Sequence, residues 1–121
     1  MDYKIRFDNE KCVIVVDLLG NSISQNIVEN LLEDLKYKIE EFSCDKVIFD
    51  LRNTFIANKF SNVYRYGLLY ASSGVNNGIK TASVYSNKSL KYKVIEKVLL
   101  DRGFIHKSFD KIAEAFLWIS Q

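Results

Sequence analysis

The 121-residue sequence has no proline and only two cysteines, and each shortage narrows what the chain can be. Without proline, no loop is stiffened by a fixed backbone angle, and one class of turn signal is missing. Cys12 and Cys44 form neither a CxxC pair nor a zinc-binding spacing, which favours two reduced thiols over a disulfide framework. No group of carboxylates, cysteines or histidine has metal-site spacing, so we expect neither a metal nor another cofactor.

Charge of one sign and long apolar runs are also scarce. The formal net charge is +2, and no basic run supports nucleic-acid binding. No apolar stretch approaches the ~20 residues that a membrane span needs. The polar N-terminus alternates like a strand and lacks the features of a secretory signal. We therefore expect a soluble, cytoplasmic protein that does not bind nucleic acid or span a membrane.

Catalytic patterns are missing as well. Residues 73–78 contain two glycines but match neither the GxGxxG nor the P-loop pattern. His106 is the only histidine, and because the sequence nominates no partner for it, we favour a structural or surface role. Asp50 and Arg52 share one face of a strand and could hold an anion, but we favour an ion pair or a loop-fixing carboxylate. An enzyme using these two residues and Ser61 is the least favoured hypothesis, and we expect no enzyme.

What the sequence does contain is enough apolar material for one core. Apolar residues make up 48% and charged residues 26% of the chain, an ordinary balance for a soluble domain. We predict a single domain over residues 1–121. Tyr3, Ile5 and Phe7 alternate with charged residues, which predicts an edge strand, and the apolar run over residues 12–19 predicts an interior strand paired with it.

The rest of the chain alternates between helical and strand patterns. Apolar residues three and four apart predict a first helix that Ser22 or Ser24 caps and that runs to about residue 42. Strands are predicted over residues 46–51, 79–85 and 104–107. Further helices are predicted over residues 63–72, 90–100 and 111–120. Asn62 is the expected cap of the second helix, and Gly67 is the weak point of that helix. Gly103 follows the third helix as a left-handed cap. Ser108 or Asp110 is the expected cap of the last helix.

The order β-β-α-β-α-β-α-β-α predicts an α/β domain with a mixed, mostly parallel sheet covered by helices. Four segments carry a resemblance: DLLG at residues 17–20, VIFDLRN at 47–53, DRGF at 101–104, and FDKIAEAFLWI at 109–119. With this order, the chain resembles the STAS domain of sulfate transporters and anti-sigma-factor antagonists. It is most similar to the free-standing bacterial branch with a STAS-like or CRAL-TRIO-like fold.

The resemblance implies a non-enzymatic regulatory or scaffold binding module. Antagonist members of the family bind a kinase-type anti-sigma factor and are switched by phosphorylation of a serine at the start of the second helix. In this chain that turn falls on residues 57–60, which contain no serine. Ser61 and Thr54 are the nearest hydroxyl groups and hence the candidate phosphoacceptors.

Aromatic residues crowd the loop after the third strand and the second helix, with Lys59 and Arg65 interleaved. We predict that this region contacts a protein partner or a second copy of the chain, because exposed tyrosine beside arginine is typical of interfaces. Burial of the aromatic rings against the sheet is the alternative. The predicted contact residues are Arg52, Asn58, Lys59, Phe60, Ser61, Tyr64, Arg65 and Tyr66.

A second hypothesis follows from the CRAL-TRIO-like side of the resemblance. The same aromatic residues would line a pocket between the second helix and the sheet, and the pocket would hold a small apolar ligand or a lipid.

Overall fold

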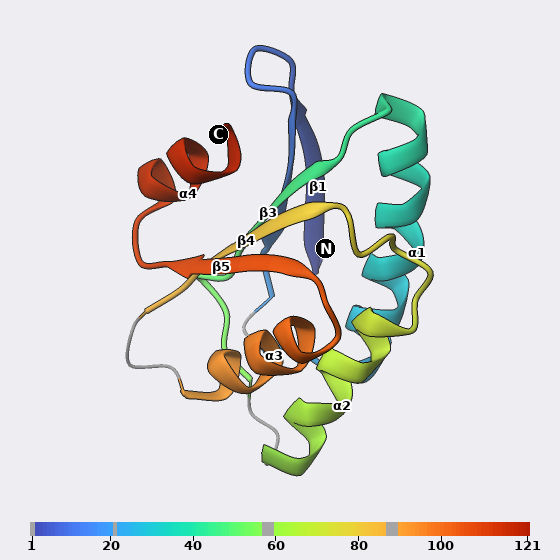
Figure 1. The fold of residues 1–121 in the computed structure, drawn as a ribbon. Helices are drawn as coiled ribbons and strands as arrows, with labels where there is room; N and C mark the ends of the chain where they lie inside the picture. The colour runs from blue at the N-terminus through green and yellow to red at the C-terminus, as the bar shows by residue number, and fades with distance from the viewer. Residues whose placement is uncertain (1, 21, 57–59, 87–89) are drawn as a thin grey trace.

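The computed structural model describes residues 2–20, 22–56, 60–86 and 90–121 (Figure 1). In this part of the chain, five strands and four helices follow one another in the predicted order. They are β1 (Tyr3–Asp8), β2 (Val13–Leu18), α1 (Gln25–Phe42), β3 (Lys46–Asp50), α2 (Phe60–Ala71), β4 (Lys80–Val84), α3 (Leu90–Asp101), β5 (Ile105–Phe109) and α4 (Ile112–Ile119).

The strands form one mixed sheet in the order β1-β2-β3-β4-β5. The first pair is antiparallel and the others are parallel, which confirms the predicted α/β fold. A short turn joins β1 to β2, whereas a helix joins each later pair and brings the chain back to start a parallel strand. The interior position of β2 explains its composition, since Val13, Ile14, Val15 and Val16 are all fully buried.

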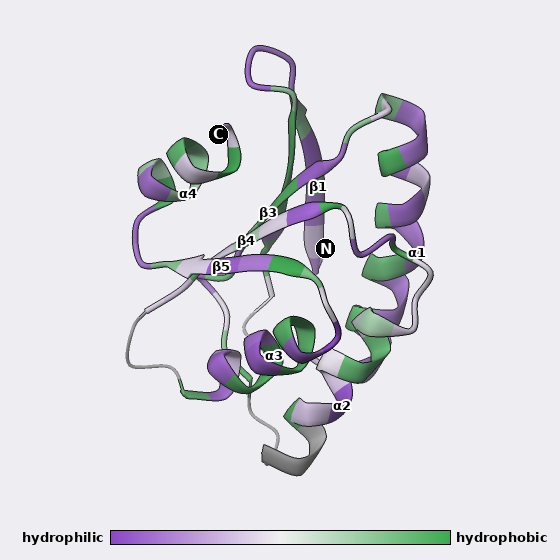
Figure 2. Ribbon diagram, viewed as in Figure 1, coloured by the Kyte–Doolittle hydropathy of each residue, from purple (hydrophilic) through white to green (hydrophobic). Residues whose placement is uncertain are grey.

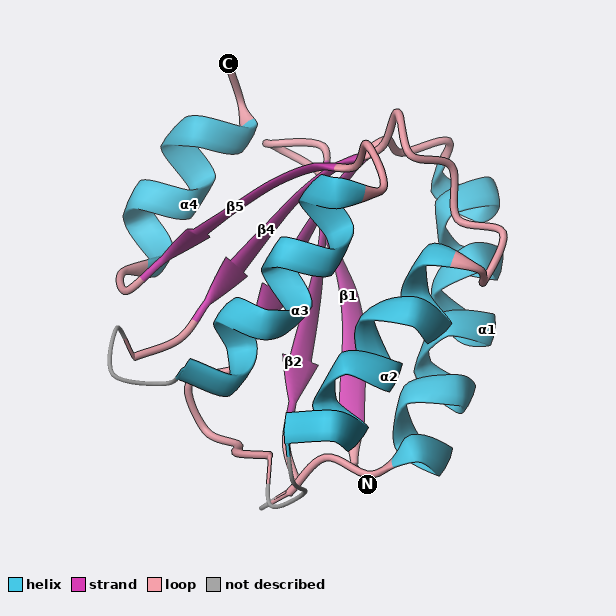
Figure 3. Cartoon of the chain, turned by 60° about the horizontal axis from the view of Figure 1, so that its bottom comes forward, coloured by secondary structure: helices cyan, strands magenta, loops and turns pink. Residues whose placement is uncertain are grey.

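The helices cover the two faces of the sheet unequally. Figure 3 shows α1, α2 and α3 side by side over one face, and α4 packs alone on the other, against β3, β4 and β5. On the three-helix side, α1 buries Leu31, Leu32 and Leu35. Figure 2 shows polar and apolar residues alternating along this helix. On the opposite face, Ala115 and Ile119 of α4 complete a smaller cluster with residues of the sheet.

The predicted helix ends are correct in part. The Ser24 hydroxyl accepts a hydrogen bond from the Ile27 N–H at 3.4 Å and caps α1. Gly103 has a φ of 82°, which confirms the left-handed position after α3. The prediction for α2 is wrong, because the helix begins at Phe60 and Asn62 lies inside its first turn.

The predicted cap of α4 is also wrong. Lys111 occupies the cap position and its side chain makes no capping hydrogen bond. The reason is that β5 extends to Phe109, so Ser108 belongs to the strand, where its hydroxyl donates to Glu96. Asp110 lies between the strand and the cap.

Gly67 has a packing role that its helix propensity does not reveal. A Cβ atom at this position would lie 2.8 Å from the Cβ atom of Val98 in α3, closer than carbon atoms approach. A glycine here therefore lets α2 and α3 pack closely, and it is more than a weak point of the helix.

Two further findings concern the cysteines and membrane-spanning helices. Cys12 and Cys44 are both free thiols. In the part of the chain that the structure describes, no helix combines the length and apolar character needed to cross a bilayer.

Candidate functional site

The loop after β3 is held in place by an ion pair at its start. Arg52 donates from Nε and Nη2 to the two Asp50 carboxylate oxygens at 2.9 and 2.8 Å, and its backbone N–H donates to the same carboxylate at 3.2 Å. These hydrogen bonds outweigh burial and lower the pKa of Asp50. The favoured interpretation of these residues, an ion pair and a loop-fixing carboxylate, is confirmed.

Residues of α3 hold the remainder of the loop. The Tyr92 hydroxyl donates to the Thr54 carbonyl at 3.2 Å, and the Lys91 ammonium donates to the Ile56 carbonyl at 2.9 Å. Residues 52–56 are therefore held to the fold at their start, at Thr54 and at Ile56.

Exposed apolar side chains gather where the parallel strands end. Leu19 follows β2 and is 47% exposed, and Phe55 follows β3 and is 56% exposed. Tyr64 lies in the first turns of α2 and is 50% exposed. Leu90 begins α3 after β4 and is 63% exposed. They are four of the eight large hydrophobic residues that are exposed in the described ranges. Because the carboxyl ends of parallel strands meet at one edge, the segments that carry these residues and the exposed Arg52 and Arg65 leave the sheet at the same end. Figure 1 shows α2 and α3 beginning at that end of the molecule. We call this set, Leu19, Arg52, Phe55, Tyr64, Arg65 and Leu90, the carboxyl-edge surface.

The predicted contact residues are distributed differently. Arg52, Tyr64 and Arg65 belong to the carboxyl-edge surface, whereas Tyr66 is buried on the inner side of α2. Asn58 and Lys59 lie outside the described residues, and the side chains of Phe60 and Ser61, the first two residues of α2, lie outside them as well. Of the two candidate phosphoacceptors, Thr54 has a buried hydroxyl with no hydrogen-bond partner among the described residues.

Beneath α2 and α3 lies a pocket of about 100 Å³. The three-helix side contributes apolar walls, including Leu31, Ile95 and Leu99, and the sheet contributes Phe49 and several polar residues. Besides Tyr66 and Tyr92, four residues with polar side chains belong to this mainly apolar lining. They are Tyr70, Ser83, Glu96 and His106.

His106 is buried between two hydroxyl groups of β4. Its Nδ1 lies 2.7 Å from Thr81 Oγ1, and its Nε2 lies 3.2 Å from Ser83 Oγ. The Thr81 hydroxyl also donates to the Ile105 carbonyl at 3.2 Å, and a carbonyl can only accept. The Thr81 oxygen must therefore accept from Nδ1–H, which leaves Nε2 to accept the Ser83 proton.

Burial keeps this imidazole neutral. It lowers the pKa of His106 to about 4, although the nearby Glu96 carboxylate opposes the shift. The same carboxylate accepts hydrogen bonds from Tyr85 at 3.2 Å and from Ser108. The polar groups therefore form two neighbouring hydrogen-bonded sets, one of His106 with Thr81 and Ser83 and one of Glu96 with Tyr85 and Ser108.

The hydroxyl of Tyr70 differs from these hydrogen-bonded groups. The other three tyrosines of the pocket region donate to acceptors, namely Tyr66 to Ile23, Tyr85 to Glu96 and Tyr92 to Thr54. Tyr70 is only 6% exposed, and its hydroxyl has no partner among the described residues. Leaving a buried hydroxyl unpaired costs about 1–3 kcal/mol, so this atom calls for an explanation.

The aromatic neighbours of Tyr70 fix its ring. Its centroid lies 5.9 Å from that of Phe49 and 5.3 Å from that of Phe104, both in edge-to-face geometry. The ring cannot swing its hydroxyl into solvent without breaking both contacts. A phenylalanine at this position would make the same ring contacts.

The contact between Ser83 and His106 raises the question of nucleophilic catalysis, because a base beside a hydroxyl is the minimum for it. Two features of the site oppose that role. A histidine with a pKa of about 4 is a weak base at neutral pH. Its Nδ1 faces the neutral Thr81 hydroxyl, which cannot stabilise an imidazolium as a carboxylate would. The arrangement suits binding of a neutral group better than proton transfer.

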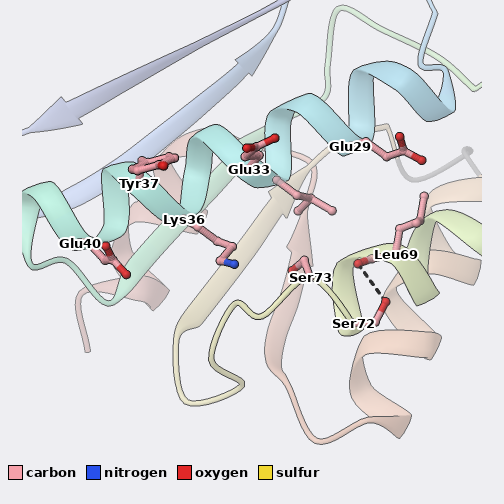
Figure 4. A pocket seen from close by; sticks show the side chains of 9 residues that line it. Glu29, Glu33, Lys36, Tyr37, Glu40, Leu69, Ser72 and Ser73 are labelled. Carbon is pink, nitrogen blue, oxygen red and sulfur yellow. Dashed lines mark hydrogen bonds between the residues drawn. The ribbon is translucent and has the colours of Figure 1, made fainter.

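A larger groove of about 570 Å³ lies between α1 and α2 (Figure 4). Three glutamates and Lys36 give it a polar lining. Its two serines already have backbone acceptors, since Ser72 donates to Leu68 at 2.7 Å and Ser73 donates to Tyr70 at 2.7 Å. These two hydroxyls therefore do not call for a ligand.

Sequence reasoning did not find the polar lining of the pocket. The signal was present in β4, where Thr81 and Ser83 alternate with apolar residues and hence share one face of a buried strand. What the sequence does not contain is the register that sets Thr81 opposite His106.

Comparison with models of protein families and with curated proteins gives no match for this chain.

Proposed function

We propose that the chain is a non-enzymatic regulatory or scaffold module that binds a protein partner, or a second copy of itself, through the carboxyl-edge surface. The observation that carries this proposal is that four exposed large apolar side chains, and the exposed Arg52 and Arg65, all lie in the segments that follow parallel strands. Aromatic side chains and arginine are enriched where protein interfaces obtain most of their binding energy. The carboxyl edge is also where α/β sheets usually bind their ligands.

The resemblance to STAS domains supports the same conclusion. The element order and the mixed five-stranded sheet are compatible with that fold. In antagonist members the start of the second helix is the regulated contact, and here the same segment borders the carboxyl-edge surface. Ser61, the second residue of α2, is the better-placed phosphoacceptor, because a helix N-terminus stabilises phosphate whereas the Thr54 hydroxyl is buried.

The test is a paired substitution on the proposed surface. Tyr64→Ala with Arg65→Glu is expected to abolish recovery of partners from the source cells, or to abolish self-association measured by sedimentation. Tyr37→Ala with Arg102→Glu is the matched control, since both residues are exposed and lie outside this surface. Equal recovery and equal self-association for both pairs would refute the proposal.

The small-ligand hypothesis remains a second candidate function, because a mainly apolar pocket lies beneath α2 and α3. Its size limits the ligand. A volume of about 100 Å³ is below that of the ~150 Å³ cavity that admits benzene, so an acyl lipid does not fit. The candidate ligand is thus a small molecule and not a lipid.

A further inference from the structure

The two cysteines meet at the start of the parallel strands, whereas the carboxyl-edge surface follows the ends of those strands. Cys12 directly precedes β2, Cys44 lies two residues before β3, and the two strands are paired. The Sγ atom of Cys44 lies 3.2 Å from the carbonyl oxygen of Cys12, although the two residues are 32 positions apart in the sequence. The fold therefore brings the two thiol-bearing residues into direct contact.

The backbone is unusual at both cysteines. Cys12 has a φ of 54° and Ser43, the residue before Cys44, has a φ of 48°; within the described ranges these are the two non-glycine residues with positive φ. Ser43 ends α1, and the N–H of Cys44 then donates to the Ile39 carbonyl at 3.1 Å. The left-handed turn at the end of the helix thus sets Cys44 against the turn between β1 and β2.

The left-handed conformation also directs the side chain of Cys12. In this conformation the Cβ atom lies close to the carbonyl oxygen of its own residue. That oxygen is the atom that the Cys44 sulfur contacts, so the Cys12 side chain leaves the backbone on the side where the second sulfur lies. Its thiol now faces the Asn9 carbonyl at 3.7 Å, a weak contact that opposes rotation toward Cys44 very little.

Exposure gives the two thiols different roles. Cys12 is exposed, whereas Cys44 is only 7% exposed. A small molecule in solution therefore reaches the sulfur of Cys12 first, and Cys44 is placed to react with whatever Cys12 has bound. Packing explains a buried cysteine such as Cys44, because its thiol behaves as a small apolar group. Packing does not explain an exposed cysteine at a left-handed position, where glycine or asparagine is the usual residue.

We propose that Cys12 and Cys44 form a reversible redox site, which a low-molecular-weight disulfide oxidises to an intramolecular disulfide. The Cys12 thiolate attacks one sulfur of the small disulfide, whose S–S bond breaks as a mixed disulfide forms and one small thiol leaves. The Cys44 thiolate then attacks the Cys12 sulfur, the protein disulfide forms, and the second small thiol leaves. Two protein thiols are oxidised, one small disulfide is reduced to two thiols, and the protons of the protein thiols pass through water to the leaving sulfurs.

This inference goes beyond the proposed function and does not depend on it. The disulfide joins the turn between β1 and β2 to the start of β3, and the loop that it closes contains β2 and α1. A cross-link across a loop of this length restricts the unfolded chain more than the folded one. The oxidised protein should therefore unfold at a temperature about 5 °C or more above that of the reduced protein.

The test is incubation of the folded, reduced protein with oxidised glutathione, followed by intact mass spectrometry and a non-reducing peptide map. The wild type is expected to lose two hydrogen atoms, to join its Cys12 and Cys44 peptides, and to gain the stated thermal stability. Dithiothreitol should reverse all three changes. Cys44→Ala should stop at one glutathione adduct on Cys12. Cys12→Asn keeps a residue that suits the left-handed turn and should gain no adduct while it is folded.

The proposal is overturned if the wild type stops at the adduct, if it forms dimers through Cys12, or if neither cysteine reacts. It is also overturned if the disulfide closes more readily in urea than in the folded protein, since the fold would then not hold the two sulfurs together. This last comparison uses the wild type alone, so it decides the question even if a substituted chain does not fold.

Discussion

At the residue scale, the environment of each buried polar group decides whether it stabilises the fold or serves a ligand. Asp50, Thr81 and Ser83 each have a hydrogen-bond partner, and so does the buried imidazole of His106. The Tyr70 hydroxyl lies among them without one. In the ligand-free protein this hydroxyl is a cost, and that cost can be measured.

Tyr70→Phe should stabilise the ligand-free protein by about 1 kcal/mol, because it removes an unpaired buried hydroxyl and keeps the ring contacts. Urea unfolding measures the change. The matched control is Tyr85→Phe, which removes a hydroxyl that donates to Glu96 at 3.2 Å and should destabilise the protein by about 1 kcal/mol. If both variants lose the same stability, the Tyr70 hydroxyl has a hydrogen-bond partner in the folded protein.

His106 should make folding stability depend on acidity in a defined window. Its pKa is lowered from 6.5 to about 4 in the folded chain, so between these values the unfolded chain binds a proton that the folded chain does not. The neutral imidazole therefore makes its full contribution to the free energy of unfolding above pH 6.5. This contribution falls as the pH drops, and below pH 4 the free energy of unfolding is lower by about 3 kcal/mol.

The measurement is direct, because the sequence contains one histidine. In ¹⁵N NMR spectra, the imidazole should remain neutral with its proton on Nδ1 down to about pH 5. Asp50 also loses its ion pair in acid, so the difference between the wild type and His106→Asn isolates the histidine contribution to the unfolding free energy. Titration near pH 6.5, or a proton on Nε2, would contradict the assigned network.

At the element scale, helix α2 contributes residues to both candidate sites. Its outer residues Tyr64 and Arg65 belong to the carboxyl-edge surface, while Tyr66 and Tyr70 line the pocket. The position of the helix depends on its contact with α3 at Gly67.

Gly67→Ala should therefore destabilise the protein by about 1–3 kcal/mol, although alanine is the better helix former by about 1 kcal/mol. The new methyl group would overlap Val98, and the helices would have to separate. The double variant Gly67→Ala with Val98→Ala removes the clash and should recover part of the loss, which a double-mutant cycle from thermal or urea unfolding would quantify. An additive cycle would mean that the two residues do not contact each other as described.

The helices and strands also show how much of the structure could be predicted from the sequence alone. The alternation in β1 and the apolar run of β2 predicted an edge strand and an interior strand correctly, because side-chain periodicity reports burial directly. The caps of α2 and α4 were predicted incorrectly, since capping residues are also common inside strands and first helical turns. The Gly67 contact could not be predicted, because it depends on which residue of α3 lies opposite.

At the scale of the whole molecule, sequence order gave the correct fold class because each helix between strands imposes a parallel return. The proposed position of the carboxyl-edge surface depends on the same rule, because parallel strands end at one edge. The pocket does not, because Tyr70, Glu96 and His106 come from three elements whose side chains meet only after the sheet and the helices have packed. A single sequence does not show which side chains of separate elements come together in the folded chain.

The central claim is that the carboxyl-edge surface contacts a protein, and site-specific photo-crosslinking in the source cells tests it most directly. A photoreactive phenylalanine analogue replaces Tyr64 in one variant and Tyr37 in another, both of which are exposed tyrosines. The account predicts a discrete crosslinked product, either with a partner or with a second copy of the chain, from position 64 and none from position 37. The same products from both positions, or none from position 64, would contradict it.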